Sequence, residues 1–136
     1  MLKQFKFMKK ALHQAHKALE LNEWPVGAVV IANNKIIASA RNMVESSDNP
    51  TAHAEIIAAN RAKDFLQTRY LENCTLFVTL EPCPMCFHYL ETLRIGKIIY
   101  GAYRSDNMQQ GEHLGGVFEL AALRLLKMFG NQLRSK

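Results

Sequence analysis

The sequence predicts an α/β fold, a three-layer α/β/α sandwich in which a mixed sheet of four to five strands is flanked by helices. Two observations predict it. The short, almost wholly apolar runs 75–80 and 97–102 have the pattern of strands covered on both faces, and a helical segment separates them. The second observation is that apolar residues near both ends of the chain recur at helical spacing, which predicts amphipathic helices there. With 136 residues, 49% of them hydrophobic, and no linker or repeat, residues 1–136 are expected to form a single domain.

The first expected elements are a helix and a hairpin. Apolar residues over 5–19 recur with three-and-four spacing, which predicts an amphipathic helix. The segments 26–32 and 35–40 are rich in β-branched residues and are joined by Asn33-Asn34. Because Asn tolerates positive φ, this pair favours a tight turn between two antiparallel strands.

The segment 41–51 is polar and lacks periodicity, so we expect a surface loop there. Strong helix formers follow from Ala52, and Thr51 is available as the cap of that helix.

The second half of the chain alternates strands and helices. A helix is predicted from Pro84 to Leu93, with the proline in the first turn, where a missing N–H is tolerated. The strands on either side of it are expected to be parallel, because a helix joins them. The polar stretch 103–116 predicts a loop, and the helical spacing of apolar residues from Phe118 to Phe129 predicts a closing amphipathic helix.

Composition and charge narrow the classes of function. The formal net charge of +5 and the pI near 9.2 permit contact with nucleic acid without requiring it. Three cysteines are too few for a disulfide framework, so a reducing, cytoplasmic setting is expected. We expect neither a signal peptide nor a membrane span, because no apolar run approaches the ~18 residues that a span needs.

Two short motifs carry the chemistry, His53-Ala54-Glu55 and Pro82-Cys83-Pro84-Met85-Cys86, and each opens a predicted helix. Since the starts of consecutive helices lie at one edge of a parallel sheet, His53, Cys83 and Cys86 are expected to converge. One nitrogen and two sulfurs suit tetrahedral zinc, with the fourth position left for water. Glu55 would then lie close enough to that water to act as a general acid and base.

The Cys-x-x-Cys pair alone leaves several interpretations open: a disulfide, a redox pair, a structural metal site or half of a catalytic centre. A structural zinc site usually needs a fourth protein ligand, and the remaining cysteine, Cys74, is better explained as a small core residue. The joint pattern of His-x-Glu with Pro-Cys-x-x-Cys about thirty residues later is typical of zinc-dependent nucleobase deaminases. An inactive zinc-folded module that binds RNA or a protein partner is disfavoured, because it has no use for Glu55.

Four motifs in the first two-thirds of the chain resemble those of the cytidine deaminase-like superfamily of zinc deaminases, and within it the bacterial tRNA-specific adenosine deaminases. They are PVGA at 25–28, RN at 41–42, PTAHAEI at 50–56 and TLEPCPMC at 79–86. The resemblance is more specific for the zinc site than for the substrate.

The resemblance implies zinc as cofactor on His53, Cys83 and Cys86, with Glu55 as the catalytic proton shuttle. The implied reaction is hydrolytic deamination of adenosine to inosine at the wobble position of tRNA, in which zinc-activated hydroxide attacks C6 of adenine. The implied partner is the anticodon loop of tRNA, with the wobble base splayed out of its stack, and the implied assembly is a homodimer.

The resemblance also implies four substrate-binding residues. Asn42 is implied to hydrogen-bond the nucleoside, Val26 and Ala28 to form the apolar floor of the base pocket, and the Ala54 backbone to lie beside it. Trp24, which precedes these motifs, is expected either at the pocket rim, where it would stack on a base, or buried behind the first helix.

The chain departs from the family pattern after Cys86, where the bulky Phe87-His88-Tyr89 replaces small residues. The loop 103–116 also matches poorly and the C-terminal region is shorter than usual, so a fifth strand is expected to be missing or reduced. Because these differences fall where the substrate is selected, a free nucleobase or nucleoside such as guanine or cytosine is the alternative substrate. His88 is expected to be a surface or interface histidine rather than a partner of the metal ligands.

Overall fold

The computed structural model describes residues 2–104 and 114–134. That part of the chain contains, in order, α1 (Leu2–Glu20), β1 (Gly27–Ala32), β2 (Lys35–Arg41), α2 (Val44–Ser47), α3 (Ala54–Leu66), β3 (Thr75–Leu80), α4 (Pro84–Thr92), β4 (Lys97–Ala102) and α5 (Glu119–Arg134). Most of the loop predicted over 103–116 lies outside the described residues.

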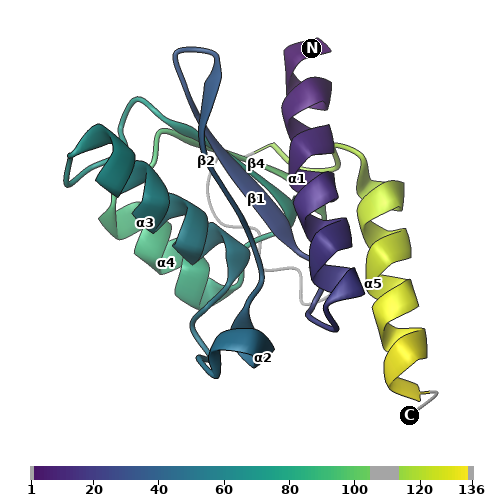
Figure 1. Ribbon diagram of the computed structural model, residues 1–136. Helices are drawn as coiled ribbons and strands as arrows, with labels where there is room; N and C mark the ends of the chain where they lie inside the picture. The colour runs from purple at the N-terminus through teal and green to yellow at the C-terminus, as the bar shows by residue number, and fades with distance from the viewer. Residues whose placement is uncertain (1, 105–113, 135–136) are drawn as a thin grey trace.

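The sheet has the strand order β2-β1-β3-β4. β1 pairs antiparallel with both β2 and β3, whereas β3 and β4 are parallel. Helices α3 and α4 cover one face of the sheet, and α1 and α5 lie side by side on the other (Figure 1). The predicted α/β/α sandwich with a mixed sheet is therefore confirmed, with four strands in the described part of the chain.

The turn between β1 and β2 forms as the sequence predicts. Asn33 and Asn34 have φ values of 51° and 62°. Two successive residues with positive φ are what a two-residue hairpin loop requires, because their twist matches that of the flanking strands.

β1 separates two hydrophobic cores. Ala28 and Val30 pack into the core beneath α3, whereas Val29 and Ile31 pack into the core beneath α1. Both faces of the strand are therefore covered, which explains why its sequence is continuously apolar rather than alternating.

The segment 41–51, predicted as a loop, contains the one-turn helix α2. A carboxylate from outside the segment fixes the start of this helix. The buried Glu23 accepts hydrogen bonds from the N–H groups of Glu45 and Ser46 at 2.9 and 2.6 Å. Since these donors lie 22 and 23 residues after their acceptor, local sequence pattern does not reveal the helix.

The prediction that Thr51 caps the next helix is wrong. α3 begins at Ala54, with His53 in an extended conformation at the N-cap position. Thr51 instead donates from its N–H and its hydroxyl to Asn49 Oδ1, at 2.9 and 2.8 Å. The turn before the helix thus occupies the threonine, and no side chain caps the start of α3.

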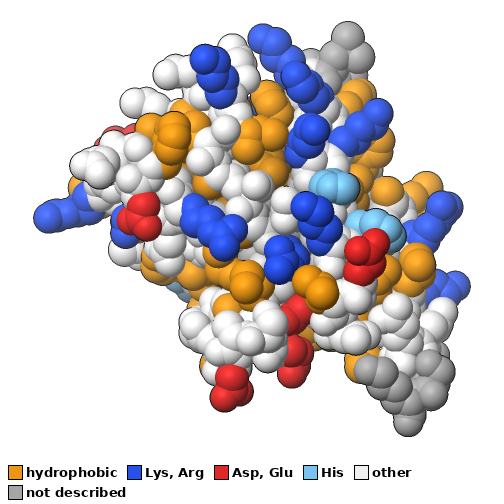
Figure 2. Space-filling model, viewed as in Figure 1, with side chains coloured by type: hydrophobic (Ala, Val, Ile, Leu, Met, Phe, Trp, Pro, Cys, Tyr) orange, Lys and Arg blue, Asp and Glu red, His pale blue; other side chains and the backbone are white. Residues whose placement is uncertain are grey.

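Lysine side chains cover the outer face of α1, where Figure 2 shows a group of blue side chains. The helix contributes five exposed lysines: Lys3, Lys6, Lys9, Lys10 and Lys17. Among the described residues, no helix is long and apolar enough to cross a membrane.

Gly27 lies where β1 and α1 touch. A β-carbon at this position would be 2.0 Å from the carbonyl oxygen of Ala11 and 2.5 Å from the amide nitrogen of Ala15. The Gly27 N–H also donates to the buried Thr79 Oγ1 at 3.1 Å, which ties β1 to β3. The close approach of α1 therefore depends on the absence of a side chain here.

Replacing Gly27 by Ala is expected to lower the free energy of unfolding by roughly 1–3 kcal/mol, because α1 must move away from β1. Urea denaturation followed by circular dichroism measures the change. Lys35→Ala, at an exposed position of β2, is the control and should shift the value by less than about 0.5 kcal/mol. Equal stability of the Gly27→Ala variant and the unchanged chain would contradict this account of the contact.

Candidate metal and active site

The side chains of His53, Cys83 and Cys86 meet at the start of two helices. His53 precedes α3, Cys83 precedes α4, and Cys86 lies in the first turn of α4. Nδ1 of His53 is 3.8 Å from Cys83 Sγ and 3.3 Å from Cys86 Sγ. All three ligand atoms lie within 4.8 Å of one another.

This donor set fits zinc. Zinc about 2.0–2.3 Å from each of a nitrogen and two sulfurs, in tetrahedral geometry, would space these atoms roughly 3.5–3.8 Å apart. The two distances from His53 lie close to that range. Three protein ligands leave one tetrahedral position for water, which is the arrangement of a catalytic rather than a structural site.

The local electrostatics favour a thiolate in the cluster. The neighbouring Cys86 thiol, and after it the His53 ring, lower the pKa of Cys83 to about 3. The same interaction with Cys83, together with burial, raises the pKa of Cys86. Both sulfurs also lie at a helix N-terminus, where free N–H groups and the helix dipole stabilise negative charge.

Glu55 lies in the first turn of α3, two residues after His53, and its side chain is buried. Burial raises the pKa of this carboxyl to about 7. A carboxyl with a pKa near neutrality exchanges protons readily in both directions, as a general acid and base must.

Glu55 opens onto a cavity of about 430 Å³ that His53, Cys83, Asn42 and Val26 also line. The metal-ligand cluster therefore faces a space of the size that holds a small molecule. Asn42 is 5% exposed, and its N–H donates to the Val26 carbonyl at 3.0 Å. This bond fixes the backbone on one side of the cavity.

The other two residues predicted to bind substrate lie deeper. Ala28 and Ala54 are fully buried and share a core cluster with Val26. They are not among the described residues that line the cavity. Their small side chains lie in the core behind the cavity wall.

Two glutamates that the sequence analysis missed shape this cavity. Glu81, 5% exposed, lines it and accepts the N–H of Arg104, which also lines it, at 3.0 Å. Glu23 fixes α2, from which Glu45 contributes to the wall. A signal existed for Glu81, because it stands inside the TLEPCPMC motif, but the sequence offers none for Glu23.

Trp24 lies at the cavity rather than behind α1. Its side chain is 51% exposed and forms part of the lining. Its ring packs on Phe129 of α5 with a centroid distance of 4.8 Å. Of the two expectations for this residue, the structure supports the rim position.

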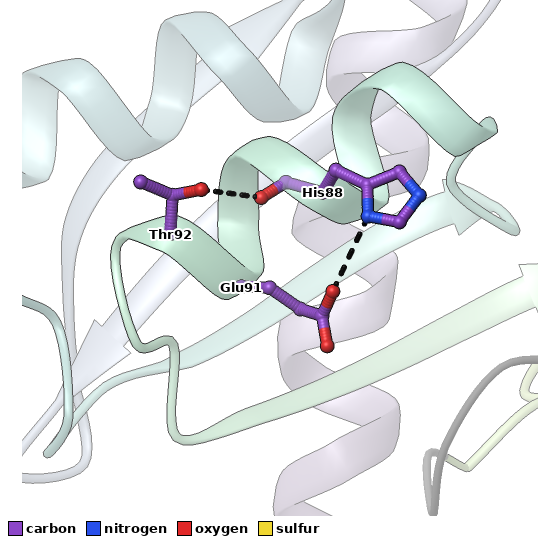
Figure 3. Close-up of polar contacts among 3 residues, drawn as sticks. All are labelled: His88, Glu91 and Thr92. Carbon is purple, nitrogen blue, oxygen red and sulfur yellow. Dashed lines mark hydrogen bonds and ion pairs between the residues drawn. The ribbon is translucent and has the colours of Figure 1, made fainter.

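The remaining cysteine and histidine expectations hold. All three cysteines are free, and Cys74 lies in the core cluster beneath α3. His88 is on the surface of α4, where its Nδ1 lies 3.4 Å from Glu91, and its carbonyl accepts a hydrogen bond from Thr92 (Figure 3). Phe87 and Tyr89 pack against the same core cluster as Cys74.

A family model matches residues 1–102, and it describes the cytidine and deoxycytidylate deaminase zinc-binding region. The match includes all three ligands and Glu55.

Two curated relatives are named tRNA-specific adenosine deaminase. The protein of Bacillus subtilis (strain 168) is 37% identical over 145 residues, which cover 96% of this chain and 90% of the relative. The protein of Aquifex aeolicus (strain VF5) is 49% identical over 96 residues, which cover 71% of this chain. In that second case the match spans 64% of the relative, slightly less than two thirds of its length.

Two solved structures have similar folds. One comes from studies of A-to-I editing by tRNA:A34 deaminases at the wobble position of transfer RNA. It has a TM-score of 0.82 and 30% sequence identity, covering 89% of this chain and 99% of that chain. The other is the guanine deaminase of Bacillus subtilis, with a TM-score of 0.71 and 35% identity, covering 74% of this chain and 65% of that chain.

Removing one sulfur ligand is expected to remove the metal. The Cys86→Ser variant should fall from about one zinc per chain to a small fraction of that, because a neutral hydroxyl replaces a thiolate ligand. Elemental analysis of the purified protein measures the zinc content. Glu55→Gln, at the neighbouring buried position, is the control and should keep its zinc. Full zinc content in Cys86→Ser would exclude this residue as a ligand.

Proposed function

The chain belongs to the cytidine and deoxycytidylate deaminase family with its zinc-binding region, and from this premise we propose that it deaminates adenosine to inosine at the wobble position of tRNA. The proposal assigns zinc to His53, Cys83 and Cys86 and proton transfer to Glu55. It rests on one observation above all. A buried carboxyl lines the same cavity as two of the three converging zinc-ligand residues, His53 and Cys83.

When bound by these ligands, zinc supplies water activated for attack on an electrophilic carbon at neutral pH. Glu55 would take one proton from that water and deliver it to N1 of the adenine ring. A second proton, from the hydroxyl that the water leaves on C6, would pass through Glu55 to the departing amine. One water enters and one ammonia leaves, so the reaction needs no further cofactor. Burial holds the pKa of Glu55 near 7, which keeps both of its protonation states within reach during the cycle.

The cavity supports a single base as its occupant. About 430 Å³ is too little space for a duplex, so a base in RNA must leave its stack to enter. We assign Asn42 to a hydrogen bond with the nucleoside and Val26 to apolar contact with the base. Ala28 and Ala54 then support the wall from the core, where larger side chains would press into the pocket.

A tRNA substrate is favoured by the relatives and by charge. The two curated relatives bear the name tRNA-specific adenosine deaminase, and the Bacillus subtilis protein matches nearly the whole chain. The lysines of α1 present positive charge to a phosphate backbone.

Guanine is the second candidate substrate, because the Bacillus subtilis guanine deaminase is 35% identical over the part of the chain that it covers. Deamination of either purine would use the same metal ligands and the same carboxyl. The preference for adenosine in tRNA or for free guanine would therefore come from the other residues in and around the cavity.

Incubating the zinc-loaded protein with a tRNA that carries adenosine at the wobble position should convert that adenosine to inosine. Reverse transcription and sequencing detect inosine as guanosine, and a tRNA with guanosine at this position is the control. Ammonia release from free guanine without any change in the tRNA would reject the proposed substrate in favour of the alternative.

Glu55→Gln should lower the rate of conversion by roughly 10²–10⁴-fold while zinc stays bound, because the amide accepts no proton. Single-turnover rates on the tRNA, paired with zinc analysis of the same preparation, measure both quantities. Undiminished turnover would remove Glu55 from the proton-transfer role.

We also propose that the protein acts as a homodimer in the cytoplasm, as the resemblance and the cysteine usage predict. Light scattering on the eluted protein should then give twice the 15.5 kDa mass of one chain. A mass of one chain over the working concentration range would reject the dimer.

A further inference from the structure

We propose that Trp24, held in place by Phe129, is a stacking surface for the base next to the target adenosine. The inference rests on the proposed action on RNA and adds a second nucleotide-binding position to it. It also supplies a reason for the enzyme to distinguish RNA from a free base.

The position of Trp24 suits this role. The residue follows the end of α1 and lies on the wall of the cavity that Glu55, His53 and Cys83 also line. A side chain with 51% exposure is a large apolar surface to leave open to water at the mouth of an active site. A nucleobase would cover it, because every base has a flat face that stacks on an aromatic ring.

The indole packs against a second aromatic ring. The ring of Phe129 lies 4.8 Å from it, tilted by 41°. Phe129 itself is only 5% exposed, and its helix α5 packs on α1 and β4. An aromatic ring fixed in this way loses little conformational freedom when a base stacks on it, so more of the stacking energy is available for binding.

The surface continues beyond the pair. A second hollow of about 510 Å³ is lined by Phe129, Leu21 and Leu133, with Asn22 and Ser46 supplying polar groups. Glu45 lines both this hollow and the active-site cavity. The aromatic pair therefore lies between two adjoining spaces, as expected if consecutive nucleotides occupy them.

The nucleotide next to the wobble base is the occupant that we expect on the Trp24 ring. When the wobble base leaves the loop, its neighbour loses a stacking partner and gains by stacking on a protein ring. A free base has no neighbour, so the same indole would contribute little to its binding.

The chain contains a single tryptophan, so its fluorescence reports on Trp24 alone. In the Glu55→Gln background, which prevents turnover, an anticodon stem-loop with adenosine at the wobble position should quench this emission. A stem-loop that lacks the base on one side of the wobble position should quench it much less. Free adenosine at a saturating concentration should leave most of the emission intact.

Substitution gives an independent measurement by fluorescence anisotropy of a labelled stem-loop. Trp24→Leu should weaken binding roughly tenfold, whereas Trp24→Phe, which keeps an aromatic face, should stay close to the unchanged chain. Phe65→Leu is the matched control, because Phe65 is 66% exposed but does not line the cavity. Equal melting temperatures and zinc contents would show that the variants are folded.

The outcomes separate this inference from the function on which it rests. Wobble deamination with unquenched emission, and with equal affinity in Trp24→Leu, would overturn the stacking role alone. Absence of both stem-loop binding and wobble deamination would overturn the tRNA substrate and this inference together. Emission that changes on dilution of the protein without RNA, and not on adding RNA, would place Trp24 in a contact between copies and would also overturn it.

Discussion

The active site depends on the close approach of two helix starts at one edge of the sheet. Neither helix can bind the metal by itself, because α3 brings one nitrogen and α4 brings two sulfurs. The side of α3 that faces the sheet is built from alanines that are fully buried. These short side chains let the helix pack closely on β1 and β2, and the start of the helix places His53 beside the cysteines. The geometry of the candidate metal site is therefore a result of core packing.

Three buried glutamates surround this centre, and their partners distinguish their roles. Glu23 accepts hydrogen bonds from backbone N–H groups of α2, and Glu81 accepts one from the N–H of Arg104, which follows β4. These hydrogen bonds hold the two backbone segments in position. The dominant influence on Glu55 is instead desolvation, which leaves it ready to exchange a proton. One residue type thus forms both the framework of the cavity and the carboxyl to which we assign proton transfer.

The elements that the sequence predicted well are those specified by local pattern. The strands, the Asn33-Asn34 turn and the proline at the start of α4 all follow from the residues in each segment. The convergence of the three metal ligands was also predictable, since topology alone brings helix starts to one edge. Two predictions failed for different reasons. The start of α2 is held by Glu23, which is distant in the sequence, whereas Thr51 does not cap α3 because the nearby Asn49 accepts its hydrogen bonds.

The dependence of α2 on Glu23 bears on how a substrate enters and a product leaves. A helix of four residues has too few internal hydrogen bonds to be stable by itself. Its start is held by the carboxylate of Glu23, which follows α1, and its one turn is closed by local hydrogen bonds such as that from Ser47 Oγ to the Met43 carbonyl. The sheet is instead held by two hydrophobic cores. Because α2 has no buried residue and belongs to neither core, we expect this side of the cavity to open by local unfolding more readily than the sheet.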